Sequence, residues 1–278
     1  MNLLKSIFIS VFMMTLVVAL GLSVWRLLQS PAEFAWWGTV LAAVVPRAFF
    51  LRLFLAPVAR TGASLWWMPL SGVAGAVVAA TLGGFGPTSA AALALAALTL
   101  LYTRWYSRFE RRAPGPLAPG SSLPSIELED TEGRVLRTDA LTQAPALWMF
   151  FRGNWCPLCM AQIREVAAQY RTLAARGVDV LLISPQPQDH SRELARRFDV
   201  PMRFLTDRDN RAAASLGILA ENGLPLGMQL LGYDADVPMP TVFITAAGGR
   251  IVYSDLTENY RIRPEPAAFI AALDRAGI

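Results

Sequence analysis

Apolar positions follow two different patterns along this chain. Up to about residue 102 they form long runs with few charges, and Glu33 is the only acidic residue before Arg104. Beyond Arg104, short apolar runs alternate with charged and polar stretches, as they do in globular domains. The pattern therefore predicts an all-α membrane region over residues 1–112 and a soluble region after it.

Four apolar runs predict about four transmembrane helices. The first, residues 6–25, is uncharged and long enough to cross about 30 Å of hydrocarbon. Lys5 before it resembles the start of a signal peptide, but we expect the run to be an uncleaved span. Pro46 and Arg47 interrupt the second run, and we expect its span to end near Arg47 or Arg52. The runs are residues 6–25, 34 to about 47, 65–82 and 88–102.

Basic residues are unevenly divided between the two sides that four spans would create. One side receives Arg26 alone, and the other receives Lys5, Arg47, Arg52, Arg60, Arg104, Arg108, Arg111 and Arg112. Because basic loops favour the cytoplasm, both chain ends are expected there. This predicts a multi-pass protein, of the inner membrane in a bacterium, with its C-terminal domain on the cytoplasmic side. In the third run, Gly72 and Gly75 permit close helix packing.

The soluble region begins with a linker rich in proline, glycine and serine at residues 113–122, followed by one domain at residues 123–278. Strand-like and helix-like runs alternate in this domain, which predicts an α/β sheet covered on both faces. We expect strands at residues 125–129, 146–151, 178–184, 202–205, 241–245 and 250–254. We expect helices at residues 160–176, 191–198, 209–216 and 266–276. Residues 221–236 have no predicted element and are either a surface loop or a lid over substrate.

Two cysteines follow the buried strand at residues 146–151 and open the next helix. Cys156 and Cys159 are three residues apart, so on a first helical turn they share a face and can close a small disulfide ring. Pro157 suits a first-turn position, where its missing N–H is not needed. The helix N-terminus stabilises a thiolate, and Arg152 adds to this if its side chain turns toward the sulfur. The motif thus predicts a redox-active pair.

Two other interpretations of this motif have less support. A structural zinc ion needs four ligands, whereas the chain has two cysteines in all and one histidine, His190. We therefore expect no metal site. A purely structural disulfide is the simpler alternative, but a strand–turn–helix setting favours a redox pair. We expect Trp155 to shape an apolar rim beside the cysteines and His190 to face solvent at a helix start.

Several stretches together resemble thioredoxin-fold redoxins. Residues 151–159, Phe-Arg-Gly-Asn-Trp-Cys-Pro-Leu-Cys, resemble the active-site signature of peroxiredoxin-like proteins, and residues 240–244 resemble the proline-led strand opposite that site. Residues 123–128 resemble the opening strand, and residues 204–207 resemble a later strand. Residues 123–276 are thus similar to the alkyl hydroperoxide reductase/thiol-specific antioxidant family, which implies a thioredoxin-like α/β fold.

The resemblance also implies roles for individual residues. Cys156 would be the attacking thiolate and Cys159 the resolving thiol, and the two would form the redox disulfide. Pro240, followed by Thr241, would be a cis-proline that packs beside the cysteines and presents backbone to substrate. Typical peroxiredoxins carry a threonine three residues before the attacking cysteine, where this chain has Gly153. The hydroxyl that would help to position a peroxide is therefore missing.

Two functions of different classes fit these observations. The first is a membrane-anchored thiol-disulfide oxidoreductase or peroxiredoxin-like antioxidant enzyme that needs no cofactor. Its dithiol would act on a disulfide or peroxide, and a thioredoxin- or glutathione-like thiol would restore it. In the second, the spans bind or move a small hydrophobic molecule, and the redoxin domain senses redox state. The hydrophobic fraction of 54% fits a lipid bilayer as partner, whereas the net charge of +4 requires no nucleic acid.

Overall fold

The computed structural model describes residues 2–110 and 113–278, which form two compact units. Residues 4–56 and 62–108 make up the first, which we call the helical unit. Residues 57–61 and 109–278, with residues 2–3, make up the second, which we call the α/β unit. The short segment at residues 57–61 therefore belongs to the α/β unit, although it lies between two helices of the helical unit in sequence.

The helices of the helical unit coincide with the predicted apolar runs. They are α1 (Asn2–Gln29), α2 (Trp36–Leu55), α3 (Trp67–Gly83) and α4 (Pro87–Leu101), and a π-helical turn, η1 (Tyr102–Tyr106), follows α4. Helix α2 continues through Pro46 and ends at Leu55, three residues beyond Arg52, the second of the two expected span ends. Pro46 is buried against neighbouring residues, and such packing compensates for the single backbone hydrogen bond that a proline removes.

Helix length separates the four helices into two pairs. By length and composition, α1 and α2 are sufficient to cross a membrane. In contrast, α3 has 17 residues and α4 has 15 residues, fewer than the roughly 20 that a membrane crossing usually needs. Among the described residues, two helices therefore meet the requirement, and the prediction of about four spans is not confirmed.

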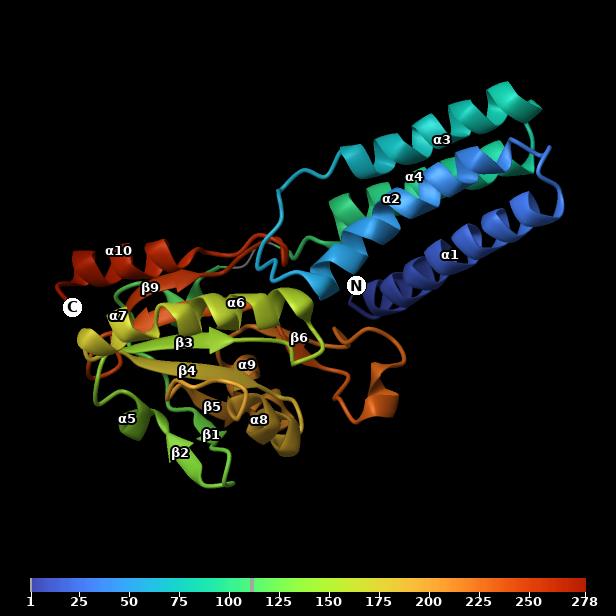
Figure 1. The fold of residues 1–278 in the computed structure, drawn as a ribbon. Coiled ribbons are helices and arrows are strands. Elements are labelled where there is room, and N and C mark those ends of the chain that lie inside the picture. The colour runs from blue at the N-terminus through green and yellow to red at the C-terminus, as the bar shows by residue number, and fades with distance from the viewer. Residues whose placement is uncertain (1, 111–112) are drawn as a thin grey trace. The chain divides into compact units, whose positions relative to one another are not determined.

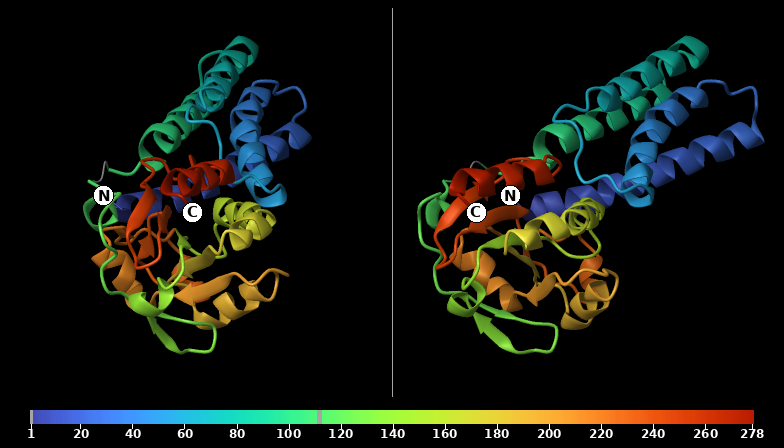
Figure 2. Two further views of the ribbon diagram at one scale, coloured as in Figure 1. Left: turned by 90° about the vertical axis from the view of Figure 1, so that its left-hand side faces the viewer. Right: turned by 60° about the vertical axis from the view of Figure 1, so that its left-hand side comes forward.

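Glycines let α2, α3 and α4 approach closely, as the sequence predicts for Gly72 and Gly75. A Cβ on Gly75 would lie 2.3 Å from the carbonyl oxygen of Gly38, and one on Gly72 would lie 2.6 Å from the Cβ of Ala96. These separations are too short for any side chain. They place α3 beside α4 along its length, as all the views show (Figures 1 and 2).

A seven-stranded mixed sheet forms the centre of the α/β unit. Its order is β2-β1-β5-β4-β3-β8-β9, with β3, β4 and β5 parallel and the flanking strands antiparallel (Figure 1). The strands are β1 (Glu127–Glu129), β2 (Val135–Arg137), β3 (Ala146–Phe150), β4 (Asp179–Ser184), β5 (Arg203–Thr206), β8 (Thr241–Thr245) and β9 (Ile251–Asp255). A separate ribbon pairs β6 (Leu219–Ala220) with β7 (Val237–Pro238).

Helices connect and cover these strands. They are α5 (Thr138–Leu141), α6 (Pro157–Ala168), α7 (Tyr170–Ala175), α8 (Gln188–Ala195), α9 (Arg211–Ser215) and α10 (Pro266–Ala276), with 3-10 turns η2 (Gly115–Leu117), η3 (Arg208–Asn210) and η4 (Met228–Leu231). The helix expected at residues 160–176 is two helices, because the backbone leaves the helical region at Gln169. The β3–α6–β4 and β4–α8–β5 crossovers advance in the same direction, so right-handedness places α6 and α8 on one face.

The core of the α/β unit explains why β3 is fully apolar. All five of its residues are buried, and the rings of Trp148 and Phe150 stack on Phe243 of β8 with centroids 5.5 and 6.2 Å apart. The indole N–H of Trp148 donates to the Thr245 hydroxyl at 3.0 Å, so its one polar atom is satisfied. Leu117, from the stretch predicted as a linker, is also fully buried in this core.

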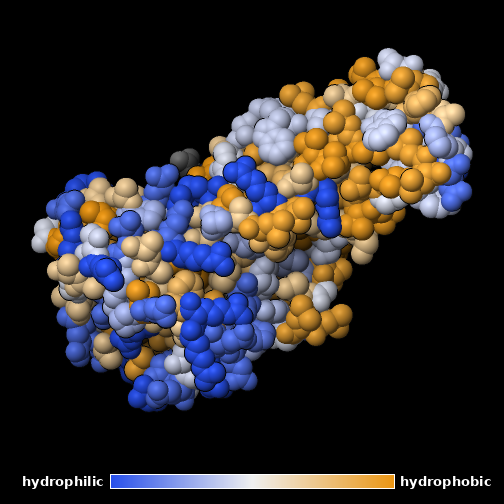
Figure 3. All heavy atoms as spheres, in the orientation of Figure 1, coloured by the Kyte–Doolittle hydropathy of each residue, from blue (hydrophilic) through white to orange (hydrophobic). Residues whose placement is uncertain are grey.

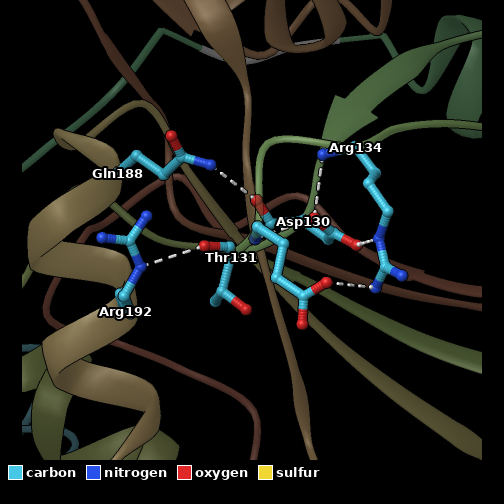
Figure 4. A network of polar contacts seen from close by, with 6 residues as sticks. Asp130, Thr131, Arg134, Gln188 and Arg192 are labelled. Carbon is cyan, nitrogen blue, oxygen red and sulfur yellow. Dashed lines mark hydrogen bonds and ion pairs between the residues drawn. The ribbon is translucent and has the colours of Figure 1, made fainter.

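Polar contacts fix the β1–β2 hairpin against the start of α8 (Figure 4). The Asp130 carboxylate accepts hydrogen bonds from the backbone N–H and Nε of Arg134, at 3.0 and 2.7 Å. Burial acts to raise the pKa of Asp130, but these hydrogen bonds lower it below its usual value. Gln188 donates to the Asp130 carbonyl at 2.9 Å and Arg192 to the Thr131 carbonyl at 3.1 Å. The turn between β1 and β2 is thereby anchored to α8.

Candidate active site

Both cysteines lie at the start of α6, just after the turn that follows β3. Cys156 is the N-cap residue of α6 and Pro157 its first helical residue, as the sequence predicts. The Cys156 sulfur accepts a hydrogen bond from the Cys159 N–H at 3.3 Å, which satisfies one of the free amides at the helix start. Both side chains are free thiols. Cys159 is fully buried and Cys156 is 4% exposed, so Cys156 is the slightly more exposed of the two residues.

A buried arginine that the sequence analysis did not identify lies beside both sulfurs. One terminal nitrogen of Arg263 is 3.6 Å from the Cys159 sulfur and 3.9 Å from the Cys156 sulfur. Its other terminal nitrogen donates to the Gln162 side-chain oxygen at 2.9 Å, and its Nε donates to the Tyr260 carbonyl at 3.1 Å. These contacts hold the guanidinium in place and leave its positive charge facing the sulfurs.

The two thiols titrate as one system. Burial, followed by the hydrogen bond and charge of Cys159, raises the pKa of Cys156 well above its usual value. Burial also acts to raise the pKa of Cys159, but its hydrogen bond with Cys156 and the Arg263 charge lower it to about 5. The first proton lost therefore leaves one negative charge that the two sulfurs share, and the pKa values belong to the pair. The lowered value falls on Cys159, whereas the resemblance implies a thiolate on Cys156.

Arg152 is part of this environment. It is only 9% exposed, its guanidinium lies 5.0 Å from the centroid of the Trp155 ring, and it donates a hydrogen bond to the Gly223 carbonyl. Its charge lowers the pKa of both cysteines, and its backbone N–H also lowers that of Cys159. Of the two readings of Arg152, thiolate partner or surface charge, burial and electrostatics favour the first. Trp155 is half-buried beside the cysteines.

Pro240 and Thr241 lie at the end of β3 from which the cysteine turn leaves, because Thr241 pairs with Phe150 in the β3–β8 ladder. The cis-proline implied by the resemblance is wrong, since no cis peptide bond occurs in the described residues. Two hydrogen bonds hold the backbone here: the Met239 N–H donates to the Ile218 carbonyl at 2.7 Å, and the Thr241 hydroxyl donates to the Met239 carbonyl at 2.9 Å. Trans is also the ordinary preference of an X–Pro bond.

The structure explains why glycine stands where typical peroxiredoxins have threonine. Gly153 has a backbone φ of +144°, a conformation that residues other than glycine rarely adopt. A Cβ at this position would also lie 2.6 Å from the indole nitrogen of Trp155. The turn that seats Trp155 beside the cysteines is therefore incompatible with the threonine. In this chain the missing hydroxyl is a consequence of the backbone path.

Residues 221–236 contact the active-site turn and include the 3-10 turn η4. Besides the bond from Arg152 to Gly223, the Tyr233 hydroxyl hydrogen bonds to the Asn154 side-chain oxygen at 2.5 Å. Trp155 packs on a small apolar cluster formed by this segment and the β6–β7 ribbon. His190, expected to face solvent, is half-buried, and its ring lies 5.2 Å from that of Tyr233. The segment is therefore one wall of the site and more than a surface excursion.

Sequence reasoning missed Arg263 and Gln162 for different reasons. Gln162 is one helical turn beyond Cys159, so helical spacing could have placed it on the cysteine face. Arg263 lies 104 residues after Cys159, and no spacing rule connects the two. Within residues 2–110 and 113–278, no group of three or more histidine, cysteine or acidic side chains is placed to hold a metal ion.

Comparisons with known proteins agree on the type of domain. Residues 119–254 match the AhpC/TSA family, a range that includes both cysteines and excludes Arg263. Peroxiredoxin Q, chloroplastic, of Oryza sativa subsp. japonica is 24% identical over 107 residues, 38% of this chain and 49% of that protein. Thiol-disulfide oxidoreductase ResA of Bacillus subtilis (strain 168) is 23% identical over 137 residues, 49% of this chain and 66% of that protein.

Two solved structures are each similar to more than half of the chain. Peroxidoxin BcpB from Mycobacterium tuberculosis has a TM-score of 0.46 and 22% identity over 58% of this chain and 97% of that one. AhpC of Enterococcus faecalis has a TM-score of 0.48 and 14% identity over 57% of this chain and 92% of that one. The chain spans about half the length of the peroxiredoxin Q proteins it matches.

Proposed function

We propose, from the match of residues 119–254 to the AhpC/TSA family, that the chain is a membrane-anchored, thiol-dependent oxidoreductase. The observation that carries the proposal is the sulfur pair beside Arg263. One sulfur is 3.6 Å and the other 3.9 Å from the guanidinium, so a negative charge on either is stabilised. A buried structural disulfide would not need such a cation.

In the proposed reaction Cys156 attacks, because it caps the start of α6 and is the more exposed of the two residues. Loss of one proton charges the pair, and attack on a substrate disulfide forms a mixed disulfide and releases one substrate thiolate. The Cys159 sulfur then displaces the second substrate thiol, which leaves a Cys156–Cys159 disulfide and a reduced substrate. An external dithiol or two monothiols, such as a thioredoxin- or glutathione-like partner, return the pair to two thiols.

A hydroperoxide is the second candidate substrate. Here the thiolate attacks the terminal peroxide oxygen, the O–O bond breaks, and an alcohol leaves after taking up a proton. The resulting sulfenic acid condenses with the Cys159 thiol to give the disulfide and water. The backbone at Gly153 leaves no room for the hydroxyl that would position a peroxide, so disulfide exchange is the better-supported reaction. Exposed leucines near the site still support an apolar hydroperoxide as a substrate.

Those leucines lie on the segment that borders the active-site turn. Residues 222–233 contain no charged side chain, and Leu226, Leu230 and Leu231 are exposed, with Leu230 91% exposed. An apolar group forms this part of the surface, and an uncharged, hydrophobic substrate would cover it favourably. This supports an apolar substrate, either a hydrophobic hydroperoxide or an unfolded or membrane protein with a disulfide.

The helical unit supports the anchor. Large apolar side chains are exposed along all four helices, among them Leu22, Leu55, Val77 and Leu93, and the apolar surface is visible in Figure 3. Exposed apolar area of this extent is unfavourable in water, whereas a bilayer would cover it. We propose a membrane location with the α/β unit on the cytoplasmic side, which the distribution of basic residues favours.

An apolar groove supports the alternative, in which the spans bind a small hydrophobic molecule. It has a volume of about 530 Å³ and lies between α1, α2 and α4. Its lining includes Val11, Met14, Val18 and Trp36. Because no cysteine or histidine is present in the helical unit, this groove could bind such a molecule but not pass electrons to it by thiol exchange.

Turnover assays on the full chain in detergent or vesicles test the proposal. We expect reduction of an insulin-type disulfide with a dithiol reductant, abolished in Cys156→Ser. Cys159→Ser should stop turnover and trap the mixed disulfide, which mass spectrometry would detect. Consumption of hydrogen peroxide and of an organic hydroperoxide, measured in parallel, separates the two substrate classes. Full activity of Cys156→Ser on every substrate would refute the proposal.

A further inference from the structure

The segment between α2 and α3 reaches the residues that carry Arg263. Arg60 Nε donates to the Arg263 carbonyl at 3.2 Å, and one of its terminal nitrogens donates to the Pro264 carbonyl at 3.3 Å. The guanidinium also forms a two-point ion pair with Glu165 of α6, one bond of which is 3.1 Å. Arg60 therefore bridges the backbone on which Arg263 stands and the helix on which both cysteines stand.

The neighbouring residue strengthens this bridge. The Thr61 N–H donates to the Arg261 carbonyl at 2.9 Å, and Arg261 donates from its guanidinium to the Thr61 hydroxyl at 2.9 Å. Arg261 is fully buried and Thr61 is half-buried, so the two bonds lie at the edge of the unit's interior. Residues 60–61 thus bind residues 261–264 side by side. The same two residues belong to the α/β unit by their contacts.

We propose that Arg60 is a positioning residue of the redox site: by binding the Arg263 and Pro264 carbonyls and Glu165 together, it holds the Arg263 guanidinium against the two sulfurs. An arginine suits this task because its planar fork donates to two carboxylate oxygens and to main-chain carbonyls at once. A lysine would keep the charge but not the fork. The inference rests on the proposed redox role of the cysteines.

The consequence follows from the distance dependence of electrostatics. Without Arg60, the backbone at residues 263–264 loses two hydrogen bonds and α6 loses its ion pair with this segment. If the Arg263 guanidinium then moved by about 2 Å from the sulfurs, the midpoint of the first thiol titration would rise by about one pH unit. The effect should appear even though Arg60 makes no hydrogen bond to either sulfur in the described structure.

The test is a pH titration of the thiolate absorbance of the reduced full chain. We expect the midpoint to rise by about one pH unit in Arg60→Ala and by less in Arg60→Lys, which retains the charge. Glu165→Gln breaks the same ion pair but removes a negative charge, which by itself lowers the midpoint, so a rise in this variant reports lost positioning alone. Arg164→Ala is the matched control, since it removes an exposed positive charge one residue from Glu165.

A double variant separates positioning from a direct charge effect. In an Arg263→Gln background, Arg60→Ala should no longer move the midpoint, because the group it positions is gone. An equal shift in both backgrounds, an equal shift in Arg164→Ala, or no shift in Arg60→Ala would each overturn the proposal. The titration does not depend on turnover. A protein that shows these shifts but reduces no substrate would therefore refute the proposed function and leave the positioning role intact.

Discussion

Replacing Arg263 by glutamine should make the cysteine pair much less acidic. The guanidinium lies 3.6 Å from one sulfur and 3.9 Å from the other, and both sulfurs are buried. Glutamine removes the charge and can still hydrogen bond to Gln162, so the change is close to a charge deletion. The Cys159 thiolate would then lose the Arg263 charge, one of the principal interactions that lower the pKa of Cys159 to about 5.

Coulomb's law sets the size of the effect. At a separation of 3.6 Å and an effective dielectric constant of about 20, two unit charges attract by roughly 4–5 kcal/mol, equivalent to about three pH units. Water that enters the space left by the guanidinium would recover part of this. We therefore expect the first thiol titration of Arg263→Gln to lie about one to three pH units above that of the unmodified protein.

Thiolate absorbance or the pH dependence of alkylation by a small iodoacetamide reports the midpoint. Arg176→Gln is the control, because Arg176 pairs with Asp274 elsewhere in the same unit.

The pH dependence of the free energy of unfolding is a second measurement, and the direction of its change can be predicted. The lowered pKa of Cys159 stabilises the reduced protein near the unfolded thiol pKa of about 8.5, and this contribution is lost as pH falls to about 5. The raised pKa of Cys156 acts with the opposite sign above the unfolded value, so the comparison is made between these two pH values. Arg263→Gln should lose that dependence. A midpoint that stays within half a pH unit would refute the electrostatic role.

Three further outcomes follow from the packing. Gly153→Ala should destabilise the α/β unit by about 1–3 kcal/mol in denaturant unfolding, and adding Trp155→Ala should recover only the part due to the Cβ contact, because the positive φ persists. Gly75→Val should lower the thermal stability of the detergent-solubilised chain, whereas Gly21→Ala, which has open space around it, should not. Leu230→Ser should reduce kcat/KM for an apolar hydroperoxide but not for hydrogen peroxide; an equal loss on both would argue against an apolar binding surface.

Much of the architecture can be predicted from the amino-acid sequence. Strand β3 and the last helix, α10, lie within a residue of their expected positions, and α6 begins three residues before its expected start, because apolar runs, prolines and capping preferences act locally. Pro157 at the helix start follows from the same local rules. The α2 helix through Pro46 is the exception, since neighbouring helices decide whether a proline ends a helix.

The active site divides in the same way. That the two sulfurs share one helical turn follows from a spacing of three residues, and that Gly153 is a glycine is visible in the sequence. Why it must be glycine depends on Trp155, whose indole fills the space of a Cβ. The trans peptide bond before Pro240 also differs from the expectation, because the cis bond was implied by the resemblance alone.

The order of the residues already supplies the available chemistry: a dithiol at the start of a helix, preceded by a buried strand and by apolar helices. The electrostatics depend on the fold, because Arg263 and Arg60 come from segments about 100 residues away from the cysteines on either side. Charges act through distance in space, and the fold alone sets that distance. Local residue preferences therefore located the sulfurs, while long-range packing determines how readily they lose a proton.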